Sequence, residues 1–369
     1  MEESALKVLK ILEDNHQEAY IVGGYVRDKL LGVKSSDIDI CTSATPREII
    51  EIFKNQTTNY NYGSVGIIYK NLIFDVTTYR KEIKYENNRK PVKIKYIKKI
   101  KADLLRRDFT INTFCMDSDG QILDILNVRS DLDNRIIKTV GNPRYKLKED
   151  ALRILRAIRF ATVLDFEIEE KTKYYLNKYA YLLKKLSYTR KKQELDKIFM
   201  SKNREKGVRL ILELKLDKYL EIPNLKDVVL CNDILGIWTQ LNVDDIYPFT
   251  KVERDQMKKI RELLSLDIDD KYNIYKYGLY KSTVAHQIKG SDITNLNIIF
   301  KKLPIKSSRD ICIGSLEIAK LLSKDPGSYL KDIIYDLEKE IVYGNVDNNK
   351  EDICKYIKSK YLKGEKNDG

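Results

Sequence analysis

Asp37 and Asp39 are the residues near the N-terminus whose types and spacing most directly suggest chemistry. They alternate with Ile38 and Ile40, and residues two apart in a strand point to the same face. Their carboxylates would then lie side by side, about 7 Å apart at Cα from a rise of about 3.3 Å per residue. Such a pair suits Mg²⁺, which takes few carboxylates and completes its shell with phosphate oxygens and water. Alone, Asp-x-Asp on a strand is more often a solvated face than a metal site.

Gly23 and Gly24 suggest an anion site just before these aspartates. They follow an apolar run, and a helix is predicted from about Tyr25 to Leu31. Unpaired N–H groups at a helix start bind anions, and Arg27 adds positive charge one turn further on. Two glycines alone would equally fit a tight turn. Combined with the aspartates, they predict a triphosphate-binding site beside a metal-binding pair, and these are the groups that nucleotidyl transfer requires.

A second block with chemical potential spans residues 104–112. It contains Arg106, Arg107 and Asp108, followed by a half-apolar stretch that ends at Asn112. Arginine offers a planar fork for phosphate oxygens, and aspartate accepts hydrogen bonds from ribose hydroxyls. The alternative is a helix end with internal salt bridges.

A third block, residues 148–160, is predicted to be one helix with an apolar face. Asp150, Arg153 and Arg156 recur at three-residue spacing, which would align them along one flank. Their acceptors and donors can mimic the pairing edge of a base. The alternative is a ladder of surface ion pairs.

The elements that position these residues change character along the chain. Short β-like runs at 19–22, 37–41, 64–70, 72–79 and 92–97 alternate with helical patterns at 4–14, 25–31 and 46–54. Residues 80–91 are polar and are predicted to form a loop. After Pro143, helical spacing dominates to the C-terminus. The sequence therefore predicts an α+β head followed by all-α parts.

The composition limits the class of protein. The chain has 369 residues, which suggests two to four domains, and a net charge of +13, which favours a polyanionic partner such as nucleic acid. Residues 171–204 hold eleven Lys/Arg against two Asp/Glu. A lysine-rich proteome is the alternative explanation of the overall charge. Scattered cysteines without CxxC pairs, two histidines, and no apolar span or signal peptide indicate a cytoplasmic protein without disulfides or zinc.

The first string, Gly23 to Thr45, resembles the tRNA nucleotidyltransferase/poly(A) polymerase family of the polymerase-β-like superfamily. This resemblance implies a polymerase-β-like nucleotidyltransferase head with a mixed sheet. It implies that Asp37 and Asp39 bind two catalytic Mg²⁺ ions, with Asp75 a possible third carboxylate. By the same resemblance the residues that contact the triphosphate are Gly23, Gly24, Arg27 and Asp28.

The later blocks resemble those of class II CCA-adding enzymes within this family. The 104–112 block would read the ribose through Arg106, Arg107, Asp108 and Asn112. Asp150 and Arg153 would serve as an amino-acid template for cytosine or adenine, with further nucleotide contacts from Arg156 and Arg159. The 80–91 segment resembles the family's flexible loop, represented by Tyr85, Arg89 and Pro91. Contacts with tRNA are expected from the basic helical part, at Lys184, Lys185, Arg190, Lys191 and Lys192.

The resemblance spans nearly the whole chain and implies four parts: a catalytic head (1–140), a neck with the template helix (141–205), a body (206–265) and a tRNA-binding tail (266–369). It implies addition of the 3′-terminal CCA to tRNA from CTP and ATP, without a nucleic-acid template and with release of pyrophosphate. No membrane and no obligate protein partner are predicted. The alternatives are a poly(A) polymerase, an enzyme that adds only CC or only A, and an RNA-binding protein on an inactive scaffold.

Overall fold

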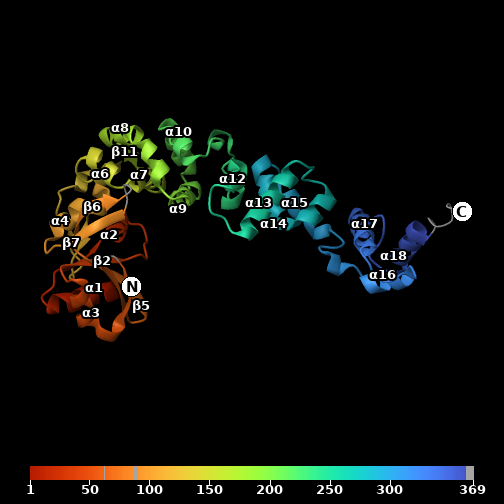
Figure 1. Cartoon of the computed structure of the whole chain (residues 1–369), viewed down its shortest axis with the longest axis horizontal. Coiled ribbons are helices and arrows are strands. Elements are labelled where there is room, and N and C mark those ends of the chain that lie inside the picture. Colours follow the sequence, from red (N-terminus) through yellow and green to blue (C-terminus); the bar gives the residue numbers. More distant parts are fainter. Residues whose placement is uncertain (62, 87–89, 363–369) are drawn as a thin grey trace. The chain divides into compact units, whose positions relative to one another are not determined.

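The computed structural model describes residues 1–61, 63–86 and 90–362 (Figure 1). The chain divides into two compact units, Met1–Lys226 and Asp227–Gly369. This boundary lies inside the predicted body, 206–265, so the first unit contains the predicted head, the predicted neck and the start of the body. The division into four parts stays a prediction.

A seven-stranded mixed sheet forms the centre of the head, in the order β3-β4-β5-β2-β1-β8-β9. Strand β1 (Ala19–Val22) is antiparallel to β2 (Asp39–Thr42) and to β8 (Cys115–Met116), whereas β2 is parallel to β5 (Leu72–Thr78). The other strands are β3 (Thr57–Asn61), β4 (Ser64–Tyr69) and β9 (Ile122–Leu123). Because Val22 is paired with Asp39, the end of β1 that leads into Gly23 lies directly beside the start of β2.

Helices α1 (Glu2–Asp14) and α3 (Pro46–Phe53) pack against the sheet and against each other (Figure 1). The α1 helix buries Ala5, Val8, Leu9 and Leu12, which recur at the spacing of one helix face. A capping box of Thr45 and Glu48 starts α3. The short helix α2 (Gly24–Leu30) follows β1 directly, one residue earlier than predicted.

The polar segment predicted as a loop over 80–91 is instead part of a separate antiparallel hairpin, β6 (Arg80–Glu86) and β7 (Lys90–Tyr96). The two backbones pair from Arg80↔Tyr96 to Glu86↔Lys90, so backbone hydrogen bonding outweighs the polar composition. Arg89 lies outside the described residues, while the backbones of Tyr85 and Pro91 face each other in the hairpin. Helix α4 (Ile100–Arg106) packs against β6.

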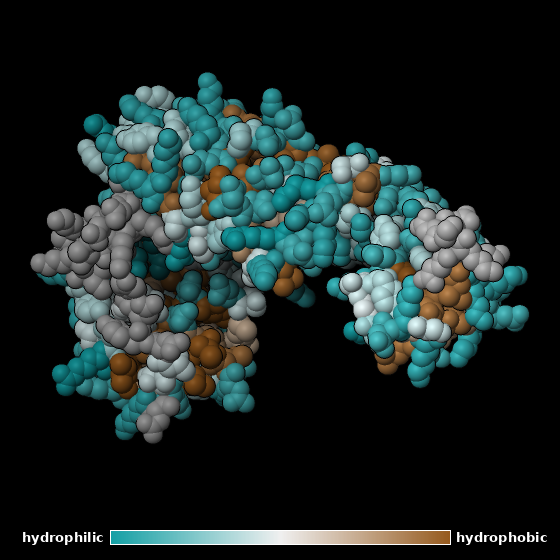
Figure 2. Space-filling view, turned by 45° about the vertical axis from the view of Figure 1, so that its right-hand side comes forward, coloured by the Kyte–Doolittle hydropathy of each residue, from teal (hydrophilic) through white to brown (hydrophobic). Residues whose placement is uncertain are grey.

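The rest of the first unit is mainly helical, and its visible face is largely hydrophilic (Figure 2). Helix α7 lies in its centre and packs against α9 and α10. A two-stranded parallel pair joins β10 to β11. The elements are α5 (Arg129–Asp133), β10 (Ile136–Ile137), α6 (Pro143–Glu149), α7 (Leu152–Leu164), β11 (Glu167–Ile168), α8 (Glu170–Lys178), α9 (Tyr188–Phe199), α10 (Arg204–Glu213) and α11 (Asp217–Leu220), with 3₁₀ turns η2 (Thr110–Asn112) and η3 (Ala180–Lys185).

Among its described residues the second unit contains helices and no strands. Its main core joins apolar residues of α14 to α18, including Leu296, Leu337 and Ile353. The helices are α12 (Ile234–Leu241), α13 (Lys251–Leu264), α14 (Lys271–Lys289), α15 (Ile293–Lys302), α16 (Ser315–Leu321), α17 (Tyr329–Tyr343) and α18 (Lys350–Ile357). Across the described ranges of both units, we find no helix with the length and apolar character needed to span a membrane.

Candidate active site

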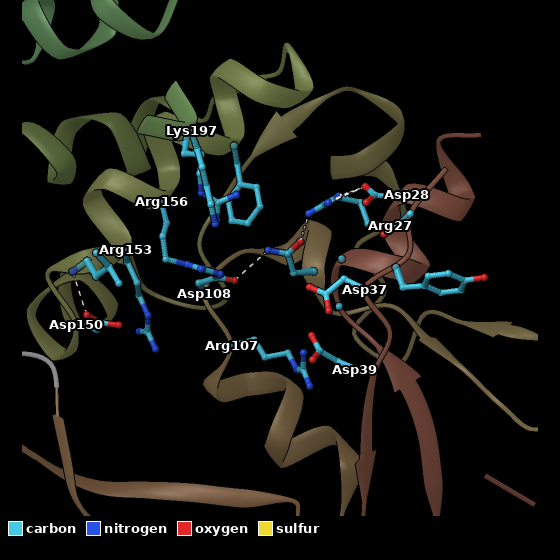
Figure 3. A pocket seen from close by; sticks show the side chains of 18 of the residues that line it. Arg27, Asp28, Asp37, Asp39, Arg107, Asp108, Asp150, Arg153, Arg156 and Lys197 are labelled. Atoms are coloured by element: carbon cyan, nitrogen blue, oxygen red, sulfur yellow. Dashed lines mark hydrogen bonds and ion pairs between the residues drawn. The ribbon is translucent and has the colours of Figure 1, made fainter. Parts of the chain in front are cut away.

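A pocket of about 540 Å³ in the first unit collects most of the side chains singled out from the sequence (Figure 3). One wall comes from α2 and the start of β2, another from the segment after α4, and a third from α7 and α9. The predicted site residues that line it are Gly23, Gly24, Arg27, Asp28, Asp37, Asp39, Arg106, Arg107, Asp108, Asn112, Asp150, Arg153, Arg156 and Arg159. The three sequence blocks therefore converge on one cavity.

Gly23 forms the tight connection between β1 and α2, and Gly24 is the first residue of α2. Gly23 has a φ of +81°, a backbone conformation that favours glycine. A Cβ atom on Gly23 would lie 3.4 Å from Arg107 Nη1 and 3.9 Å from Asp39 Oδ2. These distances are ordinary van der Waals contacts, so it is the backbone conformation that calls for glycine at this wall of the pocket.

The two aspartates reach the pocket in a different way from the prediction. Strand β2 begins at Asp39, so the prediction that one strand holds both residues is wrong for Asp37, which precedes the strand. Both side chains nevertheless point into the pocket (Figure 3). Asp75 on β5 is paired in register with Asp39, but it is exposed and is not part of the pocket lining.

The electrostatics of this pair fit a cation. Burial raises the pKa of Asp39 above its usual value, and the negative charges of Asp37 and Asp75 raise it further, while Arg107 opposes them. A bound cation would remove this repulsion. In the described part of the chain no three His, Cys, Asp or Glu side chains form a metal-binding group. A pair of carboxylates such as Asp37 and Asp39 would fit Mg²⁺, which needs only one or two carboxylates when phosphate oxygens and water supply the other ligands.

Arg27 is held inside the site. Its side chain is buried, and its Nε and Nη2 donate to Asp28 Oδ1 at 2.8 and 2.6 Å. Its Nη1 donates to Asn112 Oδ1 at 2.7 Å, which links the first block to the end of the second. The guanidinium is thus held in place by protein groups alone.

Asp103 is a buried carboxylate that the sequence reasoning missed. It accepts from Arg106 Nε at 2.8 Å, from Arg107 Nη2 at 3.4 Å and from the backbone N–H of Arg80 at 3.1 Å. The sequence holds a signal, because Asp103 precedes the two arginines by three and four residues, the spacing at which side chains meet on a helix. Asp103 therefore orients both arginines toward the pocket.

Asp108 is occupied by protein donors. Its Oδ2 accepts two bonds from Arg156, at 2.8 Å from Nε and 2.5 Å from Nη2, and its Oδ1 accepts from Asn112 Nδ2 at 3.2 Å. Burial opposes the charged form, but Arg156 and these hydrogen bonds lower the pKa of Asp108 to about 2. The carboxylate thus stays ionised and fixes Arg156 and Asn112 in the pocket wall.

The continuous helix predicted over 148–160 is wrong at Asp150. Helix α6 ends at Glu149 and α7 starts at Leu152, while Asp150 has extended backbone angles of −140° and 105°. Its Oδ1 accepts from the N–H of Leu152 at 3.0 Å, which forms a side-chain turn across Ala151, the N-cap residue of α7. Asp150 and Arg153 both line the pocket, but they do so across a helix break.

Arg153 ties three segments together from a buried position. Its Nη1 donates to the backbone oxygen of Lys146 at 2.9 Å and to Glu149 Oε2 at 3.2 Å, and its Nη2 donates to the backbone oxygen of Arg106 at 3.0 Å. The guanidinium is therefore held rigidly between α6, α7 and the end of α4.

Phe160 and Glu194 are further site elements that the sequence reasoning missed. The Phe160 ring lies under three guanidinium carbons, those of Arg159 at 4.0 Å and of Arg27 and Arg156 at 5.3 Å each. Glu194 on α9 accepts from Arg159 Nε at 2.5 Å. No local pattern signals the pair of Arg159 and Glu194, because these residues lie 35 positions apart on different helices.

The predicted tRNA contacts fall into two groups. Lys184, Lys185 and Arg190 are exposed on η3 and α9. Lys191 does not fit the prediction, because its side chain is 1% exposed and its Nζ lies 3.4 Å from the backbone oxygen of Tyr219. Lys192 forms an ion pair with Asp196 at 2.9 Å. The helix thus turns one of its basic residues into the core.

The fold and this pocket define a nucleotidyltransferase head joined to helical parts. Residues 19–138 match the model of the poly A polymerase head domain, and residues 250–357 match tRNA nucleotidyltransferase domain 2. Residues 165–228 match a model described as the probable RNA and SrmB-binding site of polymerase A. Family models thus cover both compact units.

Relatives and solved structures agree over nearly the full length. A CCA-adding enzyme of Ligilactobacillus salivarius is 34% identical, and the match covers 94% of each chain. A CCA-adding enzyme of a Geobacillus species is 31% identical, with 96% of each chain covered. The crystal structure of the Bacillus stearothermophilus CCA-adding enzyme in complex with CTP superimposes with a TM-score of 0.87 at 26% identity, covering 99% of this chain and 98% of that one. The chain belongs to the family of CCA-adding enzymes, which are tRNA nucleotidyltransferases, and the predicted family and fold class are confirmed.

Proposed function

We propose that this enzyme adds the 3′-terminal CCA to tRNA from CTP and ATP, by metal-dependent nucleotidyl transfer without a nucleic-acid template. The observation that carries the proposal is the single pocket that joins a glycine turn, an aspartate pair and the Asp150–Arg153 wall. Support for the substrates comes from relatives named as CCA-adding enzymes over 94% and 96% of this chain, and from the related structure with CTP.

Asp37 and Asp39 would hold two Mg²⁺ ions, which when bound lower the pKa of the tRNA 3′-hydroxyl and neutralise charge on the departing pyrophosphate. The protein's own contribution is positioning. Gly23 lets phosphate oxygens approach the backbone beside Asp39. Arginines already fixed by carboxylates meet the substrate with little loss of side-chain freedom, so their charge stabilises phosphate in a prepared geometry.

Base choice in this proposal belongs to Asp150 and Arg153. Asp150 presents a carboxylate acceptor, and Arg153 presents guanidinium donors on a side chain held by three protein acceptors. A rigid polar edge discriminates because the wrong base leaves buried donors and acceptors unpaired. Arg156 and Asn112, both fixed by Asp108, lie next to this edge and are assigned to the sugar and phosphates.

The tRNA itself is assigned to the basic helical surface with Lys184, Lys185 and Arg190, and to the tail of the second unit. Phosphate contacts of this kind need no base readout and weaken with salt. A poly(A) polymerase shares the head model. The match of residues 250–357 to a tRNA nucleotidyltransferase domain favours tRNA as the primer instead.

The test uses purified protein and tRNA that lacks CCA, with CTP and ATP supplied singly and together. Addition of two residues with CTP alone, and of three with both nucleotides, is expected. Asp37→Ala and Asp39→Ala should each abolish both additions and leave tRNA binding nearly intact. Extension of an oligo(A) primer in preference to tRNA would instead support a poly(A) polymerase, and more than a tenth of the activity in Asp39→Ala would contradict the metal assignment.

A further inference from the structure

The positive charges of the pocket are, with one exception, already partnered inside the protein. Each of the six arginines that line it forms an ion pair with a carboxylate. These pairs are Arg27–Asp28, Arg106–Asp103, Arg107–Asp103, Arg153–Glu149, Arg156–Asp108 and Arg159–Glu194. In each of these pairs the carboxylate offsets the charge of its arginine, except that Asp103 is shared by Arg106 and Arg107 and leaves that group one net positive charge.

Lys197 is the exception. It lies in the last turn of α9, is exposed, and lines the pocket. Glu194, one turn earlier on the same helix, would be its natural partner, but Arg159 already occupies that carboxylate at 2.5 Å. Within the described ranges no carboxylate forms an ion pair with the Lys197 ammonium. Figure 3 shows it entering from the helical wall, opposite Asp39 and Arg107.

The position of Lys197 relates it to the phosphate side of the site. Arg159 lines the same pocket as Lys197 and stacks on the Phe160 ring at 4.0 Å, and Arg27 lies 5.3 Å from the same ring. Arg27 belongs to the glycine turn assigned to the triphosphate. The proposed function assigns the base to Asp150 and Arg153 and the reacting phosphate to Asp37 and Asp39. The outer phosphates, which the glycine turn faces from one wall, are the part of the substrate left for a cation on α9.

We propose that Lys197 binds the β- or γ-phosphate of the incoming nucleoside triphosphate, and retains the pyrophosphate until it leaves. An ammonium is a compact charge that suits a phosphate whose orientation changes during reaction, whereas the paired guanidiniums are fixed. Lys197 is thus a triphosphate-binding residue that acts on both nucleotides alike. The inference rests on the proposed function, because it requires a triphosphate in this pocket.

The test compares Lys197→Gln, Lys197→Arg and the control Lys10→Gln, an exposed lysine on α1 away from the pocket. The first readout is binding of inorganic pyrophosphate in the presence of Mg²⁺, by titration calorimetry on the full chain. Lys197→Gln should weaken it about 10- to 100-fold, the scale of one hydrogen bond to a charged group. Lys197→Arg should restore most of the affinity, and Lys10→Gln should match the wild type.

The second readout is steady-state kinetics on tRNA lacking CCA. KM for CTP and for ATP should rise together in Lys197→Gln, with KM for tRNA, the CTP/UTP preference and the unfolding temperature unchanged. Unchanged pyrophosphate binding would overturn the inference, as would a rise confined to KM for tRNA or a changed nucleotide preference. If the wild type binds pyrophosphate but adds no nucleotide, the proposed function fails while the Lys197 contact stands on the binding data.

Discussion

The arginines of this site are held in position by carboxylates of the protein that do not themselves need to contact the substrate. Asp103 is fully buried beneath Arg106 and Arg107, and Asp108 holds Arg156 by two short bonds. Burying a carboxylate is costly unless several donors satisfy it, and each of these accepts at least three bonds. The arginine side chains therefore lose their conformational entropy during folding, and little further entropy is lost when a nucleotide binds.

The pair of Asp108 and Arg156 should give stability a defined dependence on acid. The folded pKa of Asp108 is about 2, below the value of about 3.9 in an unfolded chain. A lowered folded pKa adds stability above the unfolded pKa, and that stability is lost as pH falls from about 4 to 2. Asp108→Asn should therefore be destabilised by about 2 kcal/mol at neutral pH, with the difference from wild type shrinking below pH 4.

Urea unfolding at a series of pH values measures this difference. Asp119→Asn, a change at an exposed aspartate of the 117–121 turn, serves as the control and should show no comparable trend. A constant difference between wild type and Asp108→Asn from pH 7 to pH 3 would show that the ionised pair does not supply the stability.

The sequence was sufficient to find those residues of the site that stand out in their local sequence, such as paired aspartates or adjacent glycines. Asp37, Asp39, the two glycines and Asp150 all line the pocket as their blocks implied. It missed Phe160 and Glu194, because an apolar residue and a glutamate on amphipathic helices fit ordinary packing. Their roles depend on Arg27 and Arg159, which approach from other elements. Contacts of that kind are set by tertiary packing, which spacing along a chain does not encode.

At the scale of elements, the break between α6 and α7 is the feature that most shapes the site. Glu149, Asp150 and Ala151 are all tolerated within a helix, so the periodicity of the sequence predicted no break at this point. The break arises because the Asp150 side chain takes the N–H of Leu152, in competition with the helical backbone. It turns Asp150 into the pocket while Arg153 stays on the first turn of α7.

Base selection is predicted to depend on this arrangement. Asp150→Ala and Arg153→Ala should each lower the ratio of kcat/KM for CTP over UTP on tRNA lacking CCA, by about 10-fold or more, because the buried edge is no longer matched to one base. The matched control is Arg144→Ala on α6, which is exposed and outside the pocket lining. If both variants keep the wild-type ratio while kcat falls, these residues hold the helices and do not read the base.

The packing of α10 against α7 and α9 depends on one glycine. A Cβ atom on Gly207 would lie 2.5 Å from Ile198 Cγ2 and 2.6 Å from Thr162 Oγ1. Gly207→Ala should therefore destabilise the first unit by about 1–3 kcal/mol through overpacking, despite the better helix propensity of alanine. Thermal unfolding would detect this, with Glu205→Ala, an exposed change on the same helix, as the control. Equal or greater stability of Gly207→Ala would mean that the helices separate without cost.

For the whole molecule, the change from a mixed head to helical parts could be predicted from the sequence, because strand alternation gives way to helical spacing after Pro143. The boundary at Lys226 was not predicted, because helical spacing dominates on both sides of it and Pro223 is only one of several prolines in this part of the chain. Every residue of the pocket lies before this boundary. The second unit has its own core, centred on residues such as Leu296 and Leu337. Nucleotide binding and part of the tRNA grip are thus expected to be separable.

A chain of residues 1–226 should test that separation. We expect it to unfold cooperatively, because the first unit is compact by itself, and to bind CTP with Mg²⁺ within about threefold of the full chain. Its affinity for tRNA should fall about 10-fold or more at fixed ionic strength, with a shallower dependence on salt, because phosphate contacts of the tail are gone. Calorimetry with CTP and filter binding with tRNA at several salt concentrations would measure both. Undiminished tRNA affinity would confine the tRNA site to the first unit, whereas loss of CTP binding in a folded fragment would show that the pocket needs the second.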